Sequence, residues 1–162
     1  MSTDVTAPPA SDLPAALQEI VDDFAALGNP DRLQLLLDFS NELPPLPAKY
    51  AENPELLEPV PECQSPIFLI TEVSGSGPQG TVHVHFSAPP EAPTTRGFAG
   101  ILHEGLDGLA VQQVLDVPAD LPMRLSLADA VSPLRLRGMS GMLGRIQRQV
   151  RQKSGHRPSA AG

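Results

Sequence analysis

The chain has 162 residues, with 41% hydrophobic and 19% charged types, an ordinary composition for a globular protein with one core. Its net charge of −8 and its aromatic content of only 4% disfavour contacts with phosphates and bases, so nucleic acid is not an expected partner. No apolar stretch approaches the roughly 20 residues that cross a bilayer, and residues 1–10 lack the basic start and apolar centre of a secretory signal. We therefore expect a cytoplasmic protein without a membrane partner.

Two helices and an extended segment are predicted before the cysteine. Apolar residues recur at helical spacing between Ser11, a candidate N-cap, and Gly28, which ends the pattern. Residues 29–31 (NPD) indicate the start of a second helix, with a capping residue, a proline and an acidic residue in succession. The residues that this second helix is expected to bury are Leu33, Leu36 and Leu37. Three prolines within residues 43–47 then indicate an extended segment.

An antiparallel hairpin is predicted after the cysteine. Residues 67–73 are rich in β-branched and apolar types, and residues 81–87 alternate between apolar and polar side chains. The alternation places His83 and His85 on the polar face of the second strand. The connection at residues 75–80 matches G-x-G-x-x-G, but a strand follows it instead of a helix, so a nucleotide site is not expected there.

Further helices are predicted in the last third, over residues 94–106 and 111–115 and after Pro133. The last one carries a single apolar stripe, composed of Met139, Met142, Leu143, Ile146 and Val150, with Arg145, Arg148 and Arg151 outside it. Helices, then strands, then helices indicate an α+β fold with an antiparallel sheet covered on one face. We expect the domain to span residues 11–154, between a disordered tail at 1–10 and a flexible tail at 155–162.

Cys63 is the only cysteine, so the chain builds neither an internal disulfide nor a Cys₄ metal site. A free cysteine is often a small buried hydrophobe, but this one lies in a loop stiffened by Pro61 and Pro66 with polar neighbours. Gln64 and Ser65 offer donors for a thiolate or an attached sulfur. The adjacent Glu62 opposes formation of the thiolate.

Two other uses of the cysteine are possible by residue type. A cysteine hydrolase needs a histidine base near the thiol, and His83, His85 and His103 qualify by type alone. Two histidines on the polar face of a strand more often lie on a solvated surface than in a catalytic pair. Zinc is disfavoured because the spacings C-x₂-C and H-x₃₋₅-H are absent. We expect no metal.

Four segments in order resemble the landmarks of the SufE family of sulfur-acceptor proteins. They are residues 43–47 (LPPLP), 60–65 (VPECQS), 96–98 (RGF) and 132–139 (SPLRLRGM). The resemblance spans about residues 13–152. It implies an α+β fold with an antiparallel sheet packed against helices, similar also to the IscU-type cluster scaffolds. Those scaffolds hold their cluster chiefly by several thiolates, so one cysteine does not suffice for that role.

The resemblance implies that the chain is not an enzyme. It would be the acceptor and activator of a SufS-type cysteine desulfurase, taking persulfide sulfur on Cys63 and passing it to an iron–sulfur scaffold complex. The pyridoxal phosphate would belong to the desulfurase, and this chain would need no cofactor. Supporting roles at the loop fall on Gln64, Ser65 and Arg135, the last of which matches the family's C-terminal arginine.

One departure and two alternatives accompany this resemblance. Many members have glycine where this chain has Glu62, which would restrict the loop and raise the cost of a thiolate. The alternatives are a stand-alone cysteine hydrolase and an adaptor that only docks to a partner.

Overall fold

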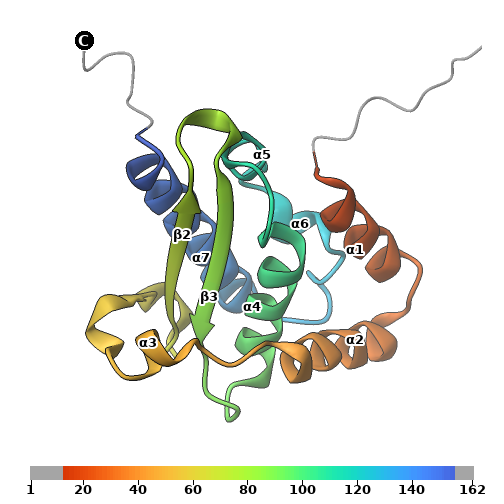
Figure 1. Ribbon diagram of the computed structural model, residues 1–162. Helices are drawn as coiled ribbons and strands as arrows, with labels where there is room; N and C mark the ends of the chain where they lie inside the picture. The colour runs from red at the N-terminus through yellow and green to blue at the C-terminus, as the bar shows by residue number, and fades with distance from the viewer. Residues whose placement is uncertain (1–12, 156–162) are drawn as a thin grey trace, which may run out of the picture.

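In the computed structural model, which describes residues 13–155, a small antiparallel sheet packs against helices from the C-terminal half of the chain, and the two N-terminal helices pack on one of these helices (Figure 1). In chain order the elements, with η for a 3₁₀ turn, are α1 (Ala15–Ala25), α2 (Asn29–Glu42), α3 (Ala48–Ala51), η1 (Pro54–Leu56), β1 (Glu58–Pro59), η2 (Pro61–Cys63), β2 (Phe68–Ser74), η3 (Gly77–Gln79), β3 (Thr81–Ser87), α4 (Pro93–Leu106), α5 (Val111–Leu115), α6 (Leu121–Arg124) and α7 (Pro133–Lys153). The predicted α+β class is confirmed. The candidate cap Ser11 and both predicted tails lie outside the described residues, apart from Gly155.

The sheet has the order β1-β2-β3 and is antiparallel throughout. The predicted hairpin is confirmed, with Phe68 opposite Ser87 at one end and Ser74 opposite Thr81 at the other. Alternation buries Val82, Val84 and Phe86 of β3 on one face, as the pattern predicted. His83 and His85 therefore project from the opposite face.

The long helix α7 packs against β2 whereas α4 packs against β3, and Figure 1 shows α7 crossing behind the hairpin. Ser132 caps it by accepting a hydrogen bond from the backbone N–H of Arg135 at 3.3 Å. All five residues of its predicted stripe are buried. Gln149 joins α7 to the sheet, because its Oε1 accepts hydrogen bonds from the backbone N–H of Thr71 at 2.8 Å and from the hydroxyl of Thr71 at 3.0 Å. None of the helices within residues 13–155 is long and apolar enough to span a membrane.

Helix α2 forms where it was predicted, but two of its three expected core residues were wrong. Leu36 is buried, whereas Leu33 and Leu37 are 39% and 38% exposed. The reason is the contact with α4, in which the backbone carbonyl of Leu36 lies directly over a glycine, Gly97. This close approach turns Leu36 and Ser40 toward α4 and leaves Leu33 and Leu37 at the surface.

The packing of α2 on α4 predicts a strong effect of adding one methyl group. A Cβ at Gly100 would lie 2.3 Å from the carbonyl oxygen of Phe39, so the helices would have to separate. We expect Gly100→Ala to lower the free energy of unfolding by about 1–3 kcal/mol in a urea titration. Gly144→Ala on α7 is the control, because a Cβ there meets nothing within 4 Å and alanine favours a helix. Equal stability of the two variants would contradict the close contact.

Candidate functional site

The cysteine stands at the end of a single tight turn that precedes the central strand. The backbone N–H of Cys63 donates to the carbonyl of Val60 at 3.1 Å, which forms the turn η2. Gln64 follows with a φ of 59°, in the left-handed region that non-glycine residues adopt at a cost. The backbone N–H of Val60 donates to the carbonyl of Ile67 at 2.9 Å and closes the loop at the start of β2. The expected loop of restricted shape is therefore present.

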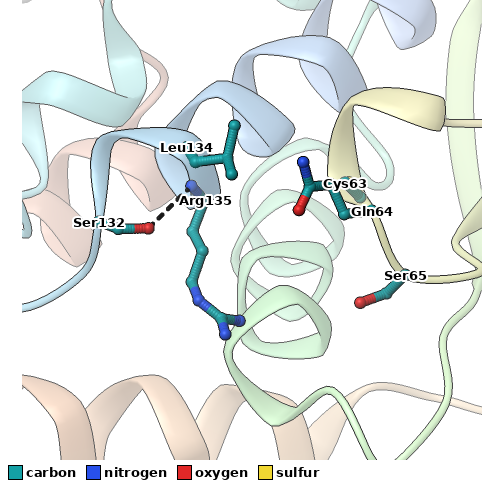
Figure 2. A pocket seen from close by; sticks show the side chains of 6 residues that line it. All are labelled: Cys63, Gln64, Ser65, Ser132, Leu134 and Arg135. Atoms are coloured by element: carbon teal, nitrogen blue, oxygen red, sulfur yellow. Dashed lines mark hydrogen bonds between the residues drawn. The ribbon is translucent and has the colours of Figure 1, made fainter.

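The loop forms one wall of a pocket of about 300 Å³. All four residues predicted for the site line it, namely Cys63, Gln64, Ser65 and Arg135. Figure 2 shows Gln64 and Ser65 facing Arg135 and Leu134 across the pocket, with Ser132 beside Arg135. The fold thus brings together residues that are far apart in the sequence, and their roles remain predictions.

The thiol of Cys63 is half-buried against the core in this position. Its Sγ donates a long hydrogen bond to the backbone carbonyl of Gly138 on α7, at 3.6 Å. Burial, and after it the neighbouring carboxylate of Glu62, raise the pKa of the Cys63 thiol to about 12 against the opposing charge of Arg145. At neutral pH the thiol is therefore protonated in this conformation, and a protonated thiol is a poor nucleophile.

Glu62 points away from the pocket toward α7 and pairs with Arg145. The Nη2 of Arg145 lies 3.0 and 2.9 Å from the two carboxylate oxygens of Glu62, and its Nε lies 3.2 Å from Oε1. The Nη1 of the same guanidinium donates to Glu58 at 2.7 Å. A hydrogen bond from its own backbone N–H lowers the pKa of Glu62, and Arg145 lowers it further, so this carboxylate stays ionised beside the thiol.

The three supporting residues lie at the pocket without bonding the sulfur. Within residues 13–155, neither Gln64 nor Ser65 makes a hydrogen bond to Sγ, and the exposed guanidinium of Arg135 forms no ion pair. Arg135 therefore presents a positive charge to the pocket and to whatever enters it.

The candidate histidines do not meet the cysteine. His83 Nδ1 lies 3.3 Å from a carboxylate oxygen of Asp107, and His85 Nε2 lies 3.2 Å from one of Glu72, both on the face of the sheet opposite α7. His103 lies on α4, and none of the histidines within residues 13–155 lines the cysteine pocket. Among the described residues no group of three His, Cys, Asp or Glu side chains is arranged to hold a metal ion. This arrangement disfavours the hydrolase alternative.

Sequence reasoning missed three residues of α7 that meet the loop of the cysteine. A Cβ at Gly138 would lie 3.1 Å from Sγ of Cys63, and one at Gly141 would lie 2.9 Å from the carboxyl carbon of Glu62. The third is Arg145, which was assigned only to the polar side of the helix. The recurrence of glycine at every third position in this stretch was the available signal, because small residues allow close approach to a helix.

Comparison with known proteins places this one-cysteine α+β domain among proteins of iron–sulfur metabolism. A family model described as "SufE: Fe-S metabolism associated domain" matches residues 18–150. An uncharacterized SufE-like protein of Mycobacterium tuberculosis is 57% identical over 144 residues, covering 89% of this chain and 96% of the relative. The chain belongs to the SufE family.

A more distant plant relative also carries the SufE-like name. SufE-like protein 1, chloroplastic/mitochondrial, of Arabidopsis thaliana is 27% identical over 143 residues, 88% of this chain but 36% of that longer protein. Among solved structures, a hypothetical protein from Thermus thermophilus superposes with a TM-score of 0.71 at 38% identity, covering 87% of this chain and 97% of the other. The predicted family is thus confirmed.

The environment of Cys63 predicts a steep pH dependence of its reactivity. With a pKa of about 12, the thiolate fraction should rise about tenfold per pH unit between pH 7 and 10, and the rate of alkylation by iodoacetamide should rise with it. Glu62→Gln removes the carboxylate that raises this pKa, so it should react faster at pH 8. Because the chain has one cysteine, intact mass reports this single site. A wild-type rate that levels off near pH 9 would contradict the raised pKa.

Proposed function

We propose that this chain is the sulfur acceptor and activator of a SufS-type cysteine desulfurase, and that Cys63 receives the sulfur. The observation that carries the proposal is the placement of the only cysteine of a SufE-family chain at an open pocket. The chain is then a carrier and not an enzyme by itself. Pyridoxal phosphate serves in the desulfurase, and this chain needs no cofactor.

The transfer is a thiol exchange that changes no overall oxidation state. The sulfur of Cys63 attacks the outer sulfur of the desulfurase persulfide, a new S–S bond forms, and the S–S bond of the donor breaks. The donor cysteine leaves with the electron pair of the broken bond. It ends as a thiol that carries the proton lost from Cys63. Cys63 is left as a persulfide, whose outer sulfur is the cargo for cluster assembly.

In the structure the loop of Cys63 lies against α7, and we call this the closed position. It suits storage of a sulfur atom better than nucleophilic attack. A half-buried thiol with a pKa of about 12 supplies almost no thiolate at neutral pH, so attack requires the loop to leave α7. A persulfide held in the same position is shielded from water and small reductants. We therefore propose that Cys63 is exposed when the desulfurase docks and is sheltered between transfers.

The recipient in this proposal is an iron–sulfur scaffold complex in the cytoplasm. A single cysteine within the chain does not assemble the several thiolates that hold a cluster, so the sulfur has to move on. Gln64, Ser65 and Arg135 are the proposed supports of the loop, because they line the same pocket as the sulfur.

The decisive experiment is an intact-mass measurement after incubation with a SufS-type desulfurase, pyridoxal phosphate and cysteine. The wild-type chain should gain the mass of one sulfur atom, which dithiothreitol should remove. Cys63→Ser should gain none and should fail to raise desulfurase turnover, although its fold and docking are unchanged. Serine is the matched control because it alters little besides the reactive atom.

Other outcomes assign other functions. Sulfur delivery that proceeds undiminished with Cys63→Ser would overturn the proposal. Binding of the desulfurase without any gain of sulfur would indicate an adaptor. A hydrolase would instead be labelled by an electrophilic substrate without a partner and would lose activity when a histidine is removed.

A further inference from the structure

We propose that Arg145 is a positioning residue that holds the Cys63 loop closed against α7, and that the loop opens when its contact with Glu62 breaks. The assignment of sulfur transfer to the open loop rests on the function proposed above. The closing of the loop by Arg145 concerns the free chain and stands on the contacts alone. We call Arg145, Glu58 and Glu62 the Arg145 clamp.

The clamp joins three elements through one guanidinium. Arg145 lies on α7, Glu62 lies in η2 directly before the cysteine, and Glu58 lies in β1 at the start of the same segment. The fork to Glu62 and the bond to Glu58 use all three nitrogens of the guanidinium, at 2.7 to 3.2 Å. Bidentate pairs such as the fork to Glu62 are stronger and more directional than single contacts. Glu58 also accepts hydrogen bonds from Arg148 and Gln149 of α7, so within the described residues the end of the segment at Glu62 is the one that Arg145 alone fixes on the helix.

The thiol itself contributes little to this closure. Its only hydrogen bond within the described residues is the 3.6 Å contact with the carbonyl of Gly138, and S–H is a weak donor. Gln64 adopts a left-handed backbone conformation that its surroundings have to maintain. The residue before it, Glu62, is held instead by strong polar contacts with Arg145.

The surface of α7 is shaped to receive the closed loop. Gly138 lies under Cys63 and Gly141 lies under Glu62, and a Cβ at either position would come within 3.1 Å of the loop. Gly144, on the same helix, meets nothing within 4 Å of its missing Cβ. The glycines of α7 that lack space for a side chain are therefore the two on which the Cys63 loop packs.

Positioning by Arg145 can be separated from its electrostatic effect, because loss of the two changes the alkylation rate of Cys63 in opposite directions. The positive charge of Arg145 favours the thiolate of Cys63, so loss of the charge alone would slow alkylation. Loss of the clamp would expose the sulfur and speed alkylation. The sign of the change therefore decides between the two roles.

The test is the rate of Cys63 alkylation by iodoacetamide in the free chain. Arg145→Gln should react about tenfold faster than the wild type at pH 8, because the open loop becomes more populated. Arg145→Lys keeps the charge without the fork and should react at an intermediate rate. Arg151→Gln removes the same charge from the exposed side of α7 and should stay within about twofold of the wild type. A rate for Arg145→Gln equal to or below that of the wild type would overturn the proposal.

A second pair of variants tests the closed loop without touching a charge. Gly138→Ala should also speed alkylation, because its methyl group displaces Cys63, whereas Gly144→Ala should not. Circular dichroism melting shows whether each chain is folded. If Arg145→Gln does not fold, this pair decides: equal rates for the two alanine variants would show that the loop is not held on α7.

The sulfur-transfer assay then connects the clamp to function. Arg145→Gln should need less desulfurase for half-maximal transfer, since the partner no longer has to open the loop. A variant that is alkylated faster but needs as much desulfurase as the wild type would overturn this link while leaving Cys63 as the acceptor. Absence of any transfer to the wild-type chain would overturn the proposed function, and the alkylation result would be unaffected.

Discussion

The position of the cysteine depends on the fit between a short loop and the glycine face of α7. Gly138 and Gly141 remove the side chains that would meet Cys63 and Glu62, and Arg145 binds the loop one turn further along the helix. The apolar stripe of the same helix is buried in the hydrophobic core. The loop is therefore held by α7, a helix that is itself fixed by packing in the core, so the closed loop is as rigid as the helix that holds it.

The same fit makes the thiol protected and unreactive at once. Burial and the Glu62 carboxylate both favour the protonated sulfur, while a reaction as nucleophile requires the thiolate. A rigid site cannot satisfy both requirements, since shelter and access need different positions of one atom. A carrier that works by thiol exchange is thus expected to have two loop positions, and the contacts that separate them matter as much as the cysteine.

Local sequence patterns predicted the fold well. The features that they did not predict depend on contacts between segments distant in the sequence. Alternation identified β3 and helical spacing identified α7, because each signal lies within one element. The exposed leucines of α2 were missed because its orientation is set by a backbone contact with Gly97. The short elements α3, β1 and α6 span too few residues to show a period. Cys63 was found from its loop and the family resemblance, whereas Arg145 lies 83 positions from Glu62 and no local pattern joins them.

Glu62 has two effects on Cys63, and opening of the loop removes only one of them. Its carboxylate anchors the loop through Arg145, and its charge disfavours the thiolate. Opening removes the anchor, but Glu62 remains covalently adjacent to the cysteine and loses its compensating guanidinium. The charge that favours a thiolate in the open loop must then come from another side chain. Among the described residues, Arg135 is the cation that lines the pocket, and under the proposed function the surface of the docked desulfurase supplies the rest of the positive charge.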